Sequence, residues 1–257
     1  GNSNIAIGAS AGLLLQGTAA ENTLIGANAG DALTTSSSNT AVGFEALSTA
    51  TVYGENTALG YRALKVSTDG HSNTSVGHET LLALDTGTSN VAVGHDAGKV
   101  LEGGASNTFV GANAGDGTDD GDENVAVGKS SLSANCGDGN VAVGHAALLS
   151  CTGATNVAMG ASAGWSMLGA NDNTCIGAVA GGSLTTGSNN LILGHDAGLT
   201  GSPGGNLTND ANKIELGDEN IAEAHIQVDW TVASDERDKT DFTALDLGLD
   251  FVKALAP

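Results

Sequence analysis

A nine-residue phrase recurs twelve times along this chain and restricts the folds open to it. The phrase begins with Asn, which is followed by Thr or an aliphatic residue. A small residue, an aliphatic residue and Gly come next. Two variable residues and Ala follow, and the ninth position is Gly or Leu. Its asparagines recur every 16 to 18 residues, at Asn4, Asn22, Asn39, Asn56, Asn73, Asn90, Asn107, Asn124, Asn140, Asn156, Asn173 and Asn190. A fixed period below 20 residues is typical of a solenoid. The sequence therefore predicts an all-β solenoid (β-roll) shaft of about twelve 17-residue coils over residues 1–198.

The three residues between Asn and Gly are predicted to form a short strand. Side chains alternate between the two faces of a strand, so the first and third residues, such as Val91 and Val93, share one face. Because these are the aliphatic positions, we expect this face to line the interior. The residue between them is usually Ala, as at Ala92. A small residue permits close approach, so we expect the second face to be buried against another chain.

The Asn and Gly of the phrase have separate structural roles. Stacked asparagines can form a ladder of amide hydrogen bonds from coil to coil. The invariant Gly is expected where φ is positive or the backbone is crowded. The variable polar stretch that follows each phrase predicts loops, which are the candidate contact surface of a solenoid.

Charge and composition exclude several classes of partner. The net charge is −21, from 29 acidic and 8 basic residues. Nucleic acid and anionic membranes both need a basic surface, so neither is expected as a partner. No apolar run approaches the roughly 20 residues of a spanning helix, and no membrane insertion is expected. The Gly-rich segments lack the Lys-Ser/Thr ending of a phosphate loop, and no cofactor is predicted.

The three cysteines leave two interpretations open. Cys136 and Cys151 precede the asparagines of consecutive coils by four and five residues, so they lie at similar places on adjacent coils. The spacing of neighbouring strands, about 4.8 Å, suits a disulfide. The alternative is two free thiols. Cys175 occupies the small-residue position of a repeat and is predicted to serve in packing.

Two clusters invite a metal hypothesis, although no metal is predicted. His78, His95, His145 and His195 each follow the repeat Gly. They could hold an ion if this position faced a three-fold axis, or they could occupy a tolerant surface position. The residues 116–123 form a dense acidic loop, but its spacing is not that of a calcium-binding loop. A solvated loop is the simpler interpretation.

The repeat ends after Gly198. Residues 199–212 are interpreted as a linker and residues 213–233 as terminal strands, including an alternating pattern over 226–232. The segment 234–257 contains a short apolar pattern over 245–255 that is compatible with an amphipathic helix. We therefore expect a short C-terminal strand-helix segment after the shaft.

The repeat and the tail each resemble a known group of proteins. The Asn-Val-Ala-Val-Gly phrase resembles the head repeats of trimeric autotransporter adhesins and, more closely, repeats of phage tail-fibre proteins. The phrase Trp-Thr-Val-x-Ser-Asp-x-Arg-x-Lys over 230–239, with Leu-Gly-Leu-Asp-Phe after it, resembles the start of the endosialidase-type intramolecular chaperone. In that family the domain trimerises, templates folding of a β-rich shaft and cuts itself off.

The resemblance to the chaperone implies a self-cleavage site. It places the cut between Ser234 and Asp235, with Ser234 as nucleophile, Lys239 as base and Arg237 as the other motif residue. A Lys can act as base where desolvation lowers its pKa. The chain runs only 23 residues past Ser234, so a truncated gene, a fragment and a copy that does not cut all stay open. A Ser-Asp pair at this point could also cap a helix.

Together these features predict a structural and adhesive protein whose only enzymatic activity would be self-cleavage. The leading hypothesis is the distal part of a viral tail fibre, a homotrimer in the virion that attaches to a host cell-surface receptor, with glycans among the candidates. The alternative is a bacterial trimeric surface adhesin or an extracellular filament subunit.

Overall fold

The computed structural model describes residues 3–225. The chain divides into two compact units, Gly1–Ile221 and Ala222–Pro257, and the solenoid is the first of them. The strand expected over 226–232, the helix expected over 245–255, and the predicted cleavage site lie outside the described residues.

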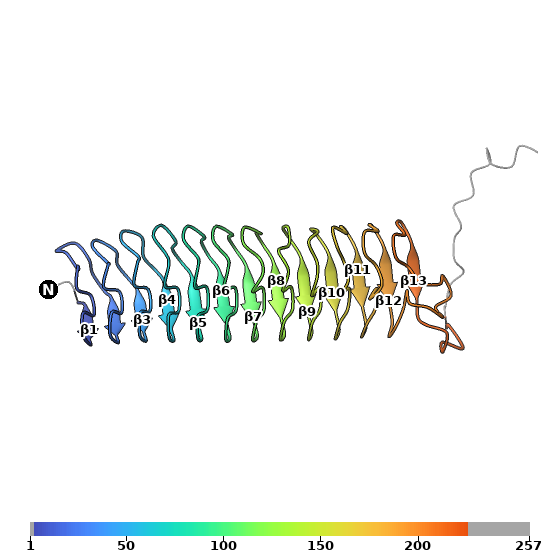
Figure 1. Ribbon diagram of the computed structural model, residues 1–257, viewed down its shortest axis with the longest axis horizontal. Coiled ribbons are helices and arrows are strands. Elements are labelled where there is room, and N and C mark those ends of the chain that lie inside the picture. Colours follow the sequence, from blue (N-terminus) through green and yellow to red (C-terminus); the bar gives the residue numbers. More distant parts are fainter. Residues whose placement is uncertain (1–2, 226–257) are drawn as a thin grey trace, which may run out of the picture. The chain divides into compact units, whose positions relative to one another are not determined.

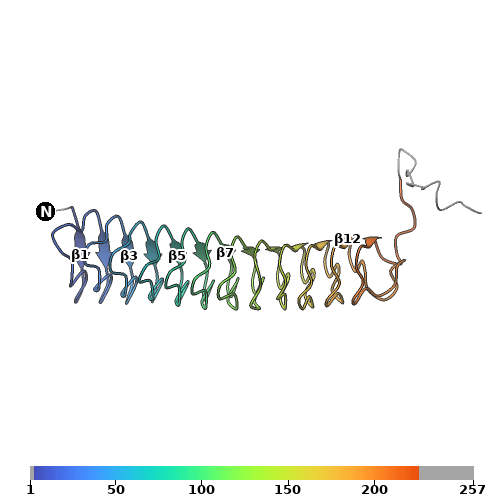
Figure 2. The same ribbon diagram turned by 90° about the horizontal axis from the view of Figure 1, so that it is seen from above.

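The first unit is an all-β solenoid, which confirms the predicted fold class (Figures 1 and 2). Its parallel strands pair in chain order in one sheet, and no helix occurs within residues 3–225. Each strand has three residues: β1 (Ile5–Ile7), β2 (Thr23–Ile25), β3 (Thr40–Val42), β4 (Thr57–Leu59), β5 (Thr74–Val76), β6 (Val91–Val93), β7 (Thr108–Val110), β8 (Val125–Val127), β9 (Val141–Val143), β10 (Val157–Met159), β11 (Thr174–Ile176), β12 (Leu191–Leu193) and β13 (Ile214–Leu216). The register is constant, so equivalent repeat positions lie side by side, as Val91 does with Thr108.

The expected orientation of the strands is wrong. The middle residue of each strand from β2 to β12 points into the coil and is fully buried, as Ala92 and Phe109 are. The flanking aliphatic residues point outward, and Val91 and Val93 are 39% and 37% exposed. The interior face and the outer face are therefore the reverse of those predicted.

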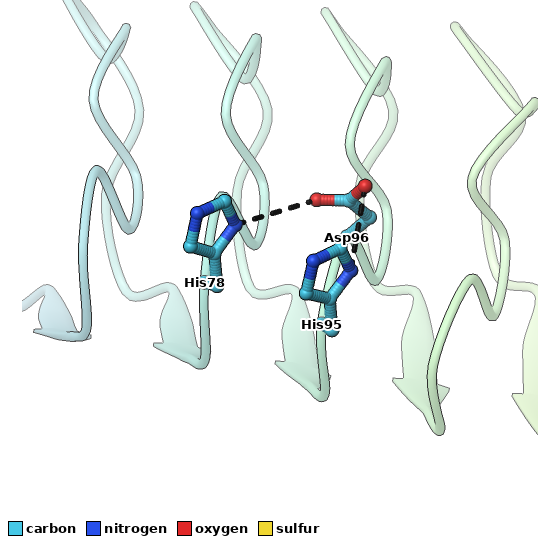
Figure 3. Close-up of side chains that lie close together, drawn as sticks. All are labelled: His78, His95 and Asp96. Carbon is cyan, nitrogen blue, oxygen red and sulfur yellow. Dashed lines mark ion pairs between the residues drawn. The ribbon is translucent and has the colours of Figure 1, made fainter.

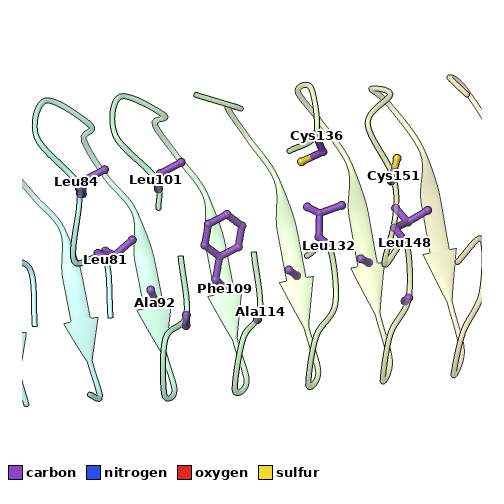
Figure 4. Packing of buried hydrophobic residues seen from close by; sticks show 14 of the residues in the cluster. Leu81, Leu84, Ala92, Leu101, Phe109, Ala114, Leu132, Cys136, Leu148 and Cys151 are labelled. Carbon is purple, nitrogen blue, oxygen red and sulfur yellow. The ribbon is translucent and has the colours of Figure 1, made fainter. Parts of the chain in front are cut away.

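The reason for the reversal is the narrow interior of the coil. The residue six positions after the strand centre also points inward, and the two side chains share one layer of core (Figure 4). Where that residue is a buried Leu, the strand centre is Ala or Ser: Ala41 with Leu47, Ala58 with Leu64, Ser75 with Leu81, Ala126 with Leu132, and Ala142 with Leu148. Small strand centres are thus required by packing within the coil.

Among strands β2 to β12, larger strand centres occur only where the partner position is Gly. The pairs are Leu24 with Gly30, Phe109 with Gly115, Cys175 with Gly181, and Ile192 with Gly198. A Cβ added at Gly115 would lie 2.7 Å from the ring of Phe109. In these layers a large strand centre is compensated by Gly at the partner position. The layers of Ala92 with Gly98 and of Ala158 with Gly164 have two small residues, and side chains of other core positions, such as Phe109 beside Gly98, fill the space.

The Gly that follows each strand is required by a close approach between coils. Gly94, for example, has a φ of 144°, and a Cβ there would lie 2.4 Å from the carbonyl oxygen of Gly111 in the next coil. Only Gly fits such a position without displacing the neighbouring backbone.

The predicted ladder of asparagines is confirmed. Asn90 is representative, since its Oδ1 accepts from the backbone N–H of Asn107 at 2.9 Å and from Asn107 Nδ2 at 3.0 Å. Its own Nδ2 donates to Asn73 Oδ1 and to the Gly104 carbonyl. Asn124 breaks the pattern, because its buried Nδ2 has no hydrogen-bond partner. Its coil is the first of two 16-residue coils, and in the second the Asn140 Nδ2 still donates to the Gly153 carbonyl at 3.0 Å, so coil length alone does not explain the unpaired donor.

The last coil is larger than the others. Residues 199–212, interpreted from the sequence as a linker, carry the buried Ser202 and Leu207. The Leu207 N–H donates to the Gly198 carbonyl at 2.9 Å. The coil closes on β13, where the buried Glu215 accepts from the backbone N–H of Gly204.

The cysteines are free thiols in the core. Thr118 Oγ1 lies 3.2 Å from Cys136 Sγ, and burial raises the pKa of Cys151 to about 11 and that of Cys175 to about 12. Of the two interpretations left open by the sequence, the structure has the free thiols, and Cys175 packs as predicted.

Candidate functional site

The outer face of the sheet is an exposed apolar surface that extends along the whole solenoid. It consists of the first and third residue of each strand, which are Thr, Val, Ile, Leu or Met in every case. Several are substantially exposed, including Leu59 at 46%, Met159 at 44% and Ile176 at 41%. We call this surface the outer face.

The outer face is large for an apolar surface of a single chain. Thirteen strands spaced at about 4.8 Å, each of three residues at about 3.3 Å, give a surface of roughly 60 by 10 Å. Monomeric proteins rarely expose continuous apolar patches above a few hundred Å². A standard interface buries about 800 Å² per partner, so the outer face with its flanking turns approaches the size of an interface.

A second distinctive region lies in the turns after β3 to β6. The first residue after each Gly carries a ring, and the four rings stack from coil to coil. The centroids of Phe44 and Tyr61 are 5.6 Å apart, those of Tyr61 and His78 are 5.0 Å apart, and those of His78 and His95 are 4.8 Å apart. Arg62 lies over the Tyr61 ring at 5.0 Å.

Charged side chains lie beside the rings. Glu45 contacts Arg62 at 2.9 Å and Lys65 at 2.7 Å, while Glu79 contacts Lys99 at 2.8 Å. Lys65 and then Arg62 hold the pKa of the Glu45 carboxyl below its usual value, through hydrogen bonds that favour the charged form. Lys99 lowers the pKa of Glu79 in the same way, and its own pKa is raised in return, mainly by Glu79 and then by Asp96.

Two histidines and an aspartate converge at one end of this ring ladder (Figure 3). His78 and His95 come from the turns after β5 and β6, and both turn Nδ1 toward the carboxylate of Asp96. His78 Nδ1 lies 3.8 Å from Asp96 Oδ1, and His95 Nδ1 lies 3.4 Å from Asp96 Oδ2. Asp96 Oδ1 is buried and accepts no hydrogen bond. Three potential metal ligands thus lie within 4.8 Å of one another.

The remaining histidines of the repeat lie in different surroundings. His195 is 3.2 Å from Asp196 and 4.0 Å from Asp218, but Asp218 is already held by Asn220, whose hydrogen bonds lower the pKa of that carboxyl. His145 follows its Gly as the others do, but the next residue is Ala146. Sequence reasoning grouped these histidines across a three-fold axis and missed the pairing within one chain. The spacing of His78 and His95 by one repeat period is the signal that could have shown that the two histidines are neighbours.

The polar loops hold an open groove of about 500 Å³ near the start of the solenoid. Its lining includes Ser37, Tyr53, Glu55, His71 and Ser72. The rings of Tyr53 and His71 are 5.8 Å apart, and Ser72 Oγ donates to Glu55 Oε2 at 3.1 Å. An aromatic ring beside hydroxyl and carboxylate groups suits a small polar ligand.

The predicted cleavage residues Ser234, Asp235, Arg237 and Lys239 lie outside the described residues, so self-cleavage stays a prediction. Within residues 3–225, no helix has the length and apolar character needed to cross a membrane. Comparison of the chain with protein-family models, curated proteins and solved structures finds no match. The functional argument therefore depends on the residues and geometry described above.

Proposed function

We propose that this chain is a structural fibre protein whose copies assemble through the outer face into a homotrimeric shaft, and that the shaft attaches a virion to a host cell surface. The observation that carries the proposal is the continuous apolar outer face. A solenoid that worked alone in water would gain from polar residues at these outward positions. Its repeats instead keep an aliphatic residue at the third position of every strand and Thr or an aliphatic residue at the first.

The rest of the surface is suited to contact with solvent and with a receptor. The excess of acidic residues lies outside the outer face, because that face contains no charged residue. The loops on the opposite side vary from coil to coil, and the groove beside Tyr53 offers hydroxyl, carboxylate and aromatic groups. Such a site suits a host glycan, and Tyr53→Ala should abolish glycan binding if the groove makes the contact.

The assembly is tested by measuring the mass of the purified chain by light scattering after size exclusion. We expect a value near three times the 25.1 kDa of one chain. Val93→Glu would place a charge in the middle of the outer face, and three copies of it would repel one another. This variant should be monomeric.

A matched control is available in Val66, which is 37% exposed, as Val93 is, but lies in a loop away from the sheet. Val66→Glu should leave the mass unchanged. A wild-type chain that is monomeric at every concentration, or a Val66→Glu variant that dissociates as fully as Val93→Glu, would contradict the proposal.

The bacterial surface adhesin or filament subunit is the alternative setting for the same assembly. It predicts the same mass and the same effect of Val93→Glu, so the two settings differ only in location. Antibodies against the shaft would label virions in the first case and bacterial surfaces in the second.

A further inference from the structure

We propose that His78, His95 and Asp96 form a binding site for a divalent transition-metal ion of the zinc type. The site lies within one chain and does not require assembly through the outer face. Its success or failure is therefore independent of the proposed fibre function.

The spacing of the three ligands fits such an ion. Zinc binds imidazole nitrogen at about 2.0–2.1 Å and carboxylate oxygen at about 2.0–2.2 Å, so neighbouring ligands in a tetrahedral shell lie roughly 3.3–3.5 Å apart. The distances from Asp96 to His95 and His78 are 3.4 and 3.8 Å. These two distances run to different oxygens of the carboxylate, and a movement of a few tenths of an ångström would bring Asp96 and His78 to the tetrahedral spacing. The two imidazole rings are stacked in parallel with centroids 4.8 Å apart, so both rings must also turn before their nitrogens can face one ion.

The side chains are free to make these movements. His78 and His95 are 47% and 59% exposed, so their rings can turn about the side-chain bonds and direct both lone pairs at one point. Asp96 is held more firmly, with 15% of its side chain exposed, and its Oδ1 has no hydrogen bond to lose. A fixed carboxylate with two adjustable imidazoles on adjacent coils leaves the fourth position of the shell to water.

The chemistry of the ligands selects the class of ion. Imidazole suits zinc, copper and nickel, whereas calcium and magnesium prefer shells made of oxygen ligands. Lys99 competes with the ion, because its Nζ lies 3.3 Å from Asp96 Oδ2. The lysine also contacts Glu79 at 2.8 Å and can keep that partner when the ion binds.

The test is calorimetric titration of Zn²⁺ into the full chain, prepared without a histidine tag. The starting protein carries His195→Ala, which removes the looser His195 cluster. We expect one equivalent of Zn²⁺ per chain and no binding of Mg²⁺. Loss of an outer-shell partner typically weakens a metal site about 10–100-fold, so His95→Ala and Asp96→Asn, which remove ligands, should weaken it at least tenfold.

Two controls separate the site from general effects. His145→Ala removes a histidine from the same repeat position but without an aspartate after it, and it should leave the affinity unchanged. Lys99→Gln removes the competing cation and should strengthen binding, a direction that a folding defect does not produce. Equal affinities for His95→Ala, Asp96→Asn and His145→Ala would overturn the proposal, as would a Lys99→Gln variant that binds more weakly.

Discussion

The asparagine ladder allows a quantitative prediction, because one of its members lacks half of the usual contacts. Asn90 and Asn124 are both fully buried and occupy the same repeat position. The side chain of Asn90 makes four hydrogen bonds, two as donor and two as acceptor. That of Asn124 accepts two, from the backbone and side chain of Asn140, and donates none.

Replacing each asparagine by alanine should therefore have unequal costs. A net hydrogen bond contributes about 1 kcal/mol, so Asn90→Ala should lower the free energy of unfolding by about 4 kcal/mol. By the same count, Asn124→Ala loses two hydrogen bonds and about 2 kcal/mol of stability. It also removes the unpaired Nδ2, whose burial without a partner destabilises the folded protein by roughly 1–3 kcal/mol, and the two effects oppose each other. Its expected cost is about 1 kcal/mol or less. Both substitutions remove the same side-chain atoms from fully buried positions, so the packing terms should be similar in the two variants.

Urea unfolding of the two variants gives the difference, and amide hydrogen exchange shows where it acts. Solenoids lose structure coil by coil, so a local readout is needed as well as a global one. The Asn107 N–H loses its acceptor in Asn90→Ala and should lose protection. Equal costs for the two substitutions, or unchanged protection at Asn107, would refute the assignment of stability to the ladder.

Three further predictions concern packing, backbone strain and pH. Phe109→Ala should lower the free energy of unfolding by about 3–5 kcal/mol. Adding Gly115→Leu should restore part of this loss, because the double variant has the Ala-Leu layer of other coils. Additive losses of the two substitutions in thermal unfolding would contradict this. Val179 has a φ of 58°, which is strained for a β-branched residue, so Val179→Asn should raise the free energy of unfolding in urea by about 1 kcal/mol; a loss would contradict this. The pKa of Glu79 is lower in the folded protein than in the unfolded chain, so this carboxylate stabilises the fold above the unfolded pKa, and the stabilisation is lost as the pH falls through the folded pKa. Glu79→Gln should therefore make the urea midpoint fall less steeply on acidification. An unchanged pH profile would contradict a stabilising role for the pair with Lys99.

The candidate metal cluster was only partly accessible from the sequence. The period of the repeat places His78 and His95 on adjacent coils, so their proximity could have been deduced. The role of Asp96 could not, because it depends on a left-handed backbone conformation, with a φ of 57°, that turns the carboxylate toward both rings. Nor does the sequence show that Lys99 reaches the same carboxylate, since long side chains choose among several partners.

By itself, the sequence determined the all-β solenoid, the position of its strands, the ladder of Asn residues and the Gly that ends each strand. These follow from the repeat alone. Coils of the same length with the same residues at the same positions make the same contacts with their neighbours, so one coil describes all of them. Which face of the strand lies inside was decided only by the tertiary structure. Both faces of a strand such as Val91–Val93 are apolar, so the alternation fits either orientation. The orientation is settled by the width of the coil. Its interior has room for Ala at the strand centre, or for a larger residue where the facing position is Gly. The aliphatic residues on either side of the strand centre therefore lie outside.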